Sequence, residues 1–235
     1  LIGDALNRVD GPAKVTGTAM YAGDYKIEGG ISEGYIVEAP VGPGRITKLD
    51  VSAAENADGV IAVLTYRNAP AQKPYGTPED EGRFTQSHAV LENDQVRHFG
   101  EPVALVVADS LEQARYAASL VEIEIEPGEG VYNPLDHRDQ EEQPESVDGL
   151  SEVDTYEGDF DAEFAGSDFV VEASYFTGAQ HSAAMEPHVT VAQWDCEKLT
   201  IHMAIQIIAS AVSAFANTLG IDEENIRIIS PFTGG

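Results

Sequence analysis

The sequence predicts an α+β fold, in which short strands alternate with a few helices. Two strand–helix–strand passages occupy residues 51–64 and 105–125, and such passages build sheets that are covered by helices. A stretch rich in Glu, Asp, Gln, Gly and Pro then interrupts the pattern at residues 127–154. A second set of strands with one apolar helix follows. The 235 residues suffice for one large domain or two small ones.

Four strands are expected in the first region, each an alternating or apolar run bounded by turn residues. They cover residues 31–38, 45–51, 60–66 and 103–108. Between the last two lies a polar, proline-containing excursion over residues 68–95. Excursions of this length inside compact domains are usually functional or mobile.

A helix is predicted to begin after Ser110, because Ser is a favoured N-cap and Gln113 can return the reciprocal bond of a capping box. Apolar side chains recur on one face at helical spacing, at Leu111, Ala114, Ala118 and Val121. Residues 121–126 then alternate strictly between apolar and Glu, which predicts a strand with one wet face.

In the second region, apolar runs predict strands at residues 169–176, 189–194, 199–206 and 226–229. An Ala-rich helix is expected over 208–219, ended by Gly220. The last strand leads into Ser230-Pro231-Phe232-Thr233-Gly234-Gly235, and glycines in this position let a backbone approach a ligand. With about 80 residues, this region is expected to be incomplete.

The composition excludes several classes of function. With 41 acidic and 13 basic residues the net charge is −28, which disfavours nucleic acids and anionic membranes as partners. No apolar stretch approaches the ~18 residues of a membrane span. A single cysteine, Cys196, excludes an internal disulfide and an iron–sulfur cluster ligated within this sequence. No G-x-G-x-x-G follows a predicted strand and no P-loop motif occurs.

Short motifs occur in a specific order along the chain. Residues 8–17 read R-x-D-G-x-x-K-V-T-G, and residues 99–109 contain Gly-Glu-Pro followed by an apolar strand. Further along come Gly158-Asp159 with Phe164, Met185-Glu186-Pro187-His188, Gln206 and Gly234-Gly235. Each motif alone is weak, but in this order and at this spacing they resemble the molybdenum-cofactor subunit of xanthine dehydrogenases and aldehyde oxidases.

The resemblance implies a domain plan and identifies the chain as an amino-terminal fragment of such a subunit. An amino-terminal extension covers residues 1–11 and an α/β hammerhead domain covers 12–126. An acidic linker at 127–154 then leads to an incomplete first part of a molybdenum-cofactor-binding α+β domain at 155–235.

The implied activity is hydroxylation of an aldehyde or an N-heterocycle with oxygen from water, at a molybdenum–pterin cofactor. The pterin holds the metal, so no protein metal ligand is expected. Partner subunits would carry the iron–sulfur clusters and FAD. The catalytic general base, a Glu, is expected beyond residue 235, so the fragment alone is predicted to be inactive. The cytoplasm is favoured as the location, with the periplasm left open.

Three residues are the candidate cofactor-binding set that the resemblance implies: Gln206, Gly234 and Gly235. A neutral Gln amide can donate to an oxo ligand without adding charge, and glycines let backbone amides approach the cofactor. Purely structural roles remain as alternatives. Gln206 would then close a strand or cap the next helix, and the glycines would form an ordinary turn.

Other polar residues invite catalytic readings that the spacing disfavours. Glu186 and His188 lack the i, i+4 spacing of a zinc-protease helix, and Pro187 opposes a helix, so a satisfied structural carboxylate and imidazole are favoured. No function is assigned to His181. A hydrolase triad of Ser182, His181 and Asp159 lacks a nucleophile elbow. The remaining alternative is a non-catalytic interaction or assembly module of a redox complex.

Overall fold

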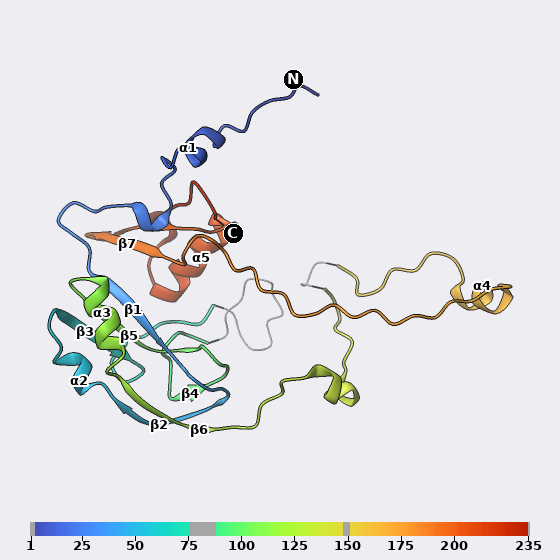
Figure 1. The fold of residues 1–235 in the computed structure, drawn as a ribbon, viewed down its shortest axis with the longest axis horizontal. Helices are drawn as coiled ribbons and strands as arrows, with labels where there is room; N and C mark the ends of the chain where they lie inside the picture. The colour runs from blue at the N-terminus through green and yellow to red at the C-terminus, as the bar shows by residue number, and fades with distance from the viewer. Residues whose placement is uncertain (1–2, 76–87, 148–150, 235) are drawn as a thin grey trace.

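The computed structural model describes residues 3–75, 88–147 and 151–234. Short strands and helices alternate, and the strands form three small sheets in the described part of the chain, so the predicted α+β fold is confirmed. Two of the sheets belong to the first region of the chain and the third to its last fifty residues (Figure 1).

The first sheet has the order β1-β5-β3, with β5 antiparallel to both neighbours. Its strands are β1 (Glu33–Glu38), β5 (Pro102–Ala108) and β3 (Val60–Thr65). The helices α2 (Ser52–Glu55) and α3 (Leu111–Ala118) contact this sheet. Three of the predicted strands therefore form where the apolar runs indicated.

The second sheet has the order β4-β2-β6, and its strands are β4 (Gln95–Val96), β2 (Gly44–Asp50) and β6 (Glu122–Pro127). Each strand–helix–strand passage leaves one sheet and enters the other, because β2 leads through α2 to β3 and β5 leads through α3 to β6. All neighbouring strands in these two sheets are antiparallel, which distinguishes this fold from a parallel α/β sheet. The short strand β4 begins at the last residue of the predicted excursion, whose residues 76–87 are outside the described part.

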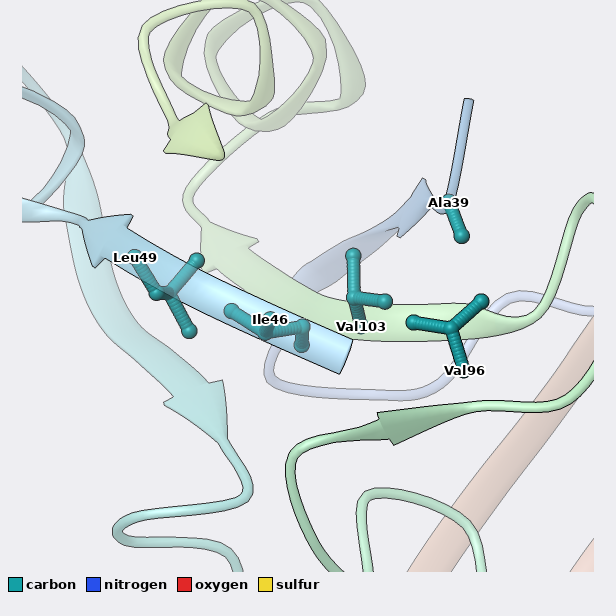
Figure 2. Packing of buried hydrophobic residues seen from close by; sticks show 5 residues of the cluster. All are labelled: Ala39, Ile46, Leu49, Val96 and Val103. Atoms are coloured by element: carbon teal, nitrogen blue, oxygen red, sulfur yellow. The ribbon is translucent and has the colours of Figure 1, made fainter. Parts of the chain in front are cut away.

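Two buried clusters hold this first region together, and β5 contributes to both. Its successive side chains point to opposite faces. On one face Val103 packs with residues of β2 and β4 and of the segment after β1, as Figure 2 shows: Ala39, Ile46, Leu49 and Val96. On the other face Val106 packs against the helices, with Ala54, Val63, Ala117 and Ala118.

The start of α3 follows the prediction in part. The side chain of Ser110 accepts a hydrogen bond from the backbone N–H of Gln113, at 3.4 Å. The prediction of a reciprocal bond, from the Ser110 backbone N–H to the Gln113 side chain, is wrong. Instead, the Ser110 hydroxyl donates to Oε1 of Gln113 at 2.8 Å. The buried face of the helix consists of Ala114, Ala117 and Ala118, whereas Leu111 is exposed.

The second region forms one sheet of order β7-β8-β9. Its strands are β7 (Thr190–Asp195), β8 (Lys198–Met203) and β9 (Ile226–Ile229). A hairpin makes β7 and β8 antiparallel, whereas α5 (Ile208–Leu219) crosses over so that β8 and β9 run parallel. The helix ends at Gly220 in the left-handed conformation, with φ 69°, as the sequence predicted.

Two strand predictions fail in this region. Residues 169–176 form no strand, and their large side chains are exposed, among them Phe169, Tyr175 and Phe176. A strand needs a hydrogen-bonding neighbour, and the described residues supply none there. The strand predicted over 199–206 ends at Met203, because the chain turns from there toward α5.

Short helical turns complete the described chain. They are α1 (Gly11–Val15), η1 (Ala22–Asp24), η2 (Pro134–Gln140), α4 (Phe160–Gly166) and η3 (Glu223–Asn225). The helix α4 was not predicted; Asp159 caps it by accepting a hydrogen bond from the N–H of Ala162 at 3.0 Å. In Figure 1, α4 lies at the end of an extended arm far from the three sheets.

Candidate functional site

The candidate site lies where β8 and β9 end side by side. Their parallel register pairs Leu199 with Ile226 and His202 with Ile229, so both strands deliver their following loops to the same edge of the sheet. In open α/β sheets, ligands commonly bind in crevices outside the carboxyl ends of the parallel strands. The loop after β8 contains Gln206, and the loop after β9 contains Gly234.

Ser230 ties these two loops together. Its hydroxyl donates to the carbonyl of Ile205 at 3.2 Å and accepts from the N–H of Ile205 at 3.1 Å. The neighbouring Gln206 lies in a bend and is exposed. The interpretation of Gln206 as a strand-closing residue is therefore wrong. The structure places its amide on a short loop that is fixed at its base.

The amino end of α5 reaches the same edge two residues after Gln206. Its N-cap residue, Ile207, makes no side-chain capping bond, and the first turn contains no acidic residue. The first backbone N–H groups of a helix have no partner within the helix, and the helix dipole makes this end partly positive. This edge therefore favours a neutral or anionic group.

Gly234 approaches Glu186 closely across the site. Its N–H donates to Glu186 Oε2 at 2.6 Å, and a Cβ at Gly234 would clash with the Cβ of Glu186. The other carboxylate oxygen, Oε1, is buried and has no hydrogen-bond partner among the described residues. The sequence-based view of Glu186 as a satisfied carboxylate is therefore wrong for one of its oxygens. Gly235 lies outside the described residues.

The remaining polar candidates do not form a catalytic group. His181, Ser182 and His188 are exposed, while Asp159 serves as the N-cap of α4. Within residues 3–75, 88–147 and 151–234, no group of three or more His, Cys, Asp or Glu side chains is placed to hold a metal ion. The helices of that part are all too short or too polar to cross a membrane.

The amino-terminal segment packs onto the loop that carries Gly234. The ring of Tyr21 lies 5.5 Å from the ring of Phe232, and Lys14 Nζ lies 5.5 Å from the centre of the same ring. Asp10 pairs with Lys14 at 2.7 Å and with Arg8 at 2.9 Å. Hydrogen bonds from Lys14 and then Arg8 lower the pKa of Asp10 to about 2. These contacts were not predicted from the sequence, although residues 8–17 form one of the family motifs.

A buried histidine supports the sheet beneath the site. His202 on β8 stacks against Tyr25, with ring centres 3.9 Å apart, and its Nδ1 has no partner in the described structure. Burial lowers the pKa of His202, and the charge of Arg227 lowers it further. The imidazole is therefore held in its neutral form.

A cavity of about 310 Å³ lies between the two regions, next to the carboxyl edge of β8 and β9. Its apolar wall includes Pro74, Val90, Met203, Ile205 and Phe215. Two hydrogen bonds cross between the regions next to it, from Lys73 N–H to Thr218 O at 3.1 Å and from Asn217 Nδ2 to Pro74 O at 2.8 Å. The sequence offered no signal for this contact.

Two family models match the chain along nearly its whole length. Residues 16–129 match the aldehyde oxidase and xanthine dehydrogenase a/b hammerhead domain. Residues 140–235, which carry the loops of the candidate site, match the molybdopterin cofactor-binding domain. The chain belongs to the xanthine dehydrogenase and aldehyde oxidase family. The resemblance inferred from the motifs is thus confirmed.

Curated relatives and solved structures agree with this assignment. The molybdenum-binding subunit of aldehyde oxidoreductase from Escherichia coli (strain K12) is 38% identical over 237 residues, which cover 100% of this chain and 31% of that protein. The large molybdopterin subunit of nicotinate dehydrogenase from Eubacterium barkeri is 30% identical, over 100% of this chain and 54% of that protein. Quinoline 2-oxidoreductase from Pseudomonas putida 86 superposes with a TM-score of 0.80 at 27% identity, over 99% of this chain and 30% of that chain.

Proposed function

We propose that this chain forms part of a molybdenum hydroxylase, which oxidises an aldehyde or an N-heterocycle with oxygen derived from water. Electrons would pass to iron–sulfur and FAD groups on partner subunits. The observation that carries the proposal is the meeting of Gln206 and the Gly234 loop at one carboxyl edge, in the segment that matches a molybdopterin cofactor-binding domain.

The residues present fit a molybdenum–pterin cofactor. The cramped approach of Gly234 to Glu186 leaves no room for a side chain, and a buried carboxylate oxygen beside it is unpartnered in the described structure. An ordinary surface turn needs neither feature. When bound, the cofactor supplies the two-electron oxidation and the oxygen transfer.

The chain's own residues bind and orient. The NH₂ group of Gln206 can donate to a molybdenum oxygen without adding charge, and the partly positive end of α5 favours an anionic ligand next to it. The glycine loop brings backbone close to the ligand. We place the general base on a Glu outside these residues, and we expect no hydroxylase activity from residues 1–235 alone.

The relatives suggest two alternative substrate classes, aldehydes and nitrogen heterocycles. Their names include an aldehyde oxidoreductase, a nicotinate dehydrogenase and a nicotine 6-hydroxylase. Aldehydes and nitrogen heterocycles share an electron-poor carbon. We therefore propose that class and no single member of it.

Replacing Gln206 by Ala tests the proposal in the full-length protein with its partner subunits. We expect a loss of about 1–3 kcal/mol of cofactor or transition-state interaction, which is a fall of roughly 5- to 150-fold in kcat/KM. Turnover of aldehyde and N-heterocycle substrates and molybdenum per protein are the measurements. Gln193→Ala, an exposed amide on β7, is the matched control. Unchanged turnover and molybdenum content in Gln206→Ala would contradict the assignment of Gln206.

A non-catalytic assembly module is the second candidate. The exposed apolar side chains of residues 169–176 favour it, because contiguous apolar surface commonly marks a contact with another surface. Molybdenum analysis separates the two candidates. A full-length protein purified without molybdenum from a host that makes the cofactor would favour the module.

A further inference from the structure

We propose that Glu186 is a positioning residue of the cofactor site, which uses its two carboxylate oxygens for two different donors. One oxygen holds the backbone N–H of Gly234, and the other accepts a hydrogen bond from an N–H group of the bound pterin. This inference rests on the proposed function, since it assigns a second donor to the same ligand.

The hydrogen bond from Gly234 links two distant segments. Its N–H lies 2.6 Å from Glu186 Oε2 and joins segments 48 residues apart in the sequence. Hydrogen bonds to an ionised acceptor are about twice as strong as neutral ones. One carboxylate thus fixes Gly234, in the loop after β9, relative to the segment that leads into β7.

The side chain of Glu186 points in a different direction from its neighbours. Its neighbours Met185 and His188 are exposed, Met185 at 94% of its surface. Glu186 alone in this group reaches inward, where its Cβ lies against Gly234. A carboxylate with an ordinary solubilising role would point outward with its neighbours.

The second carboxylate oxygen of Glu186 has no hydrogen-bond partner among the described residues. Glu186 Oε1 is buried, and no described residue donates to it. Buried polar atoms are almost always hydrogen-bonded, and an exception calls for a donor from elsewhere. A pterin carries ring and amino N–H groups, which are the donors that a carboxylate accepts.

Two substitutions separate the two oxygens. Glu186→Ala removes both acceptors. Glu186→Gln keeps one carbonyl for Gly234 but presents an NH₂ group, a donor, toward the second position. Glu197→Ala and Glu197→Gln, in the exposed turn between β7 and β8, are the matched controls.

Two measurements on the full-length enzyme follow the two bonds. Hydrogen exchange of the peptide covering residues 226–234, read by mass spectrometry, reports the Gly234 amide. Molybdenum and pterin per protein report the ligand. For Glu186→Ala we expect exchange about tenfold faster at Gly234 and loss of most of the molybdenum. For Glu186→Gln we expect near-normal exchange but a severalfold fall in molybdenum, with both Glu197 controls unchanged.

The outcomes discriminate clearly. Full molybdenum content in Glu186→Gln would overturn the assignment of the second oxygen, and normal exchange in Glu186→Ala would overturn that of the first. Failure of the proposed function looks different: the unsubstituted enzyme itself would then contain no molybdenum, while the exchange measurement would still report the bond to Gly234.

Discussion

The strands β5 and β7 show how differently the two regions of this chain are built. On β5, four of seven residues are buried and the others are half-buried, because sheet packing covers one face and α2 and α3 cover the other. On β7 only Val191 is buried, and Trp194 is 52% exposed. The first region thus completes its core with its own residues. The second region leaves much of its apolar surface open.

This contrast is consistent with the proposed ligand site in the second region. A buried core keeps a sheet rigid through close packing, whereas a site needs loops that can meet a ligand. The loops after β8 and β9 are held at their bases by Ser230 and Ile205. The loops of the candidate site are therefore positioned by a few polar bonds rather than by a core.

The largest expected effect comes from the cores themselves. Ile201 lies at the centre of β8 and is 2% exposed. The substitution Ile201→Ala should lower the free energy of unfolding of the second region by about 2–5 kcal/mol. The first region should keep its stability, because its clusters share no residue with that of Ile201. Denaturant unfolding and hydrogen exchange of β8 and β5 are the measurements.

The reciprocal change is Val106→Ala on β5, which should cost about 2 kcal/mol in the first region. Ile61→Ala, at a 56% exposed position of β3, is the control. If Ile201→Ala accelerated exchange in β5 as much as in β8, the two regions would unfold as one unit and the contrast would fail.

A smaller effect is expected at the contact between the regions. Asn217→Ala removes the hydrogen bond to the carbonyl of Pro74. It should weaken the interaction free energy between the two regions by about 1 kcal/mol. Exchange should then quicken at residues 72–75 without change in β5. Thr218→Ala is the control, since the bond from Lys73 uses the Thr218 backbone. An equal effect of both substitutions would point to packing rather than the Asn217 bond.

The smallest effect is a pH dependence confined to the second region. Because burial lowers the pKa of His202 below its usual 6.5, the unfolded chain binds a proton more readily than the folded one. Stability should therefore be unaffected by this group above pH 6.5 and fall as the pH drops below it. His202→Phe keeps a ring against Tyr25 and should flatten that part of the profile.

Thermal unfolding of the two proteins between pH 7.5 and 5 checks this, with His188→Phe as the exposed control. A His202→Phe profile parallel to that of the parent protein would show that other groups cause the dependence.

The helices α3 and α5 and most strands were predictable because their signals are local. Ser110 and Gly220 mark a helix start and a helix end through bonds and dihedral angles within a few residues. The Glu–Ile alternation of β6 likewise needs only its own sequence to define two faces. The family also followed from motif order, and the family models confirm it.

The candidate site was predictable only in its membership. Gln206 and Gly234 could be named from the motifs, but nothing in the sequence places Glu186 against Gly234 or Lys14 and Tyr21 around Phe232. The prediction of a strand at residues 169–176 was wrong for a related reason. A run of apolar residues favours a strand but does not supply the neighbouring strand with which it must pair.

By itself, then, the sequence determined most of the strands, the helices α3 and α5, the acidic charge and the family of this chain. The tertiary structure alone decided which distant residues meet. The parallel pairing of β8 with β9 brings two loops to one edge, and that edge creates the close approach of Glu186 to Gly234. Contacts of this kind join residues far apart in the chain, and only packing of the whole sheet fixes them.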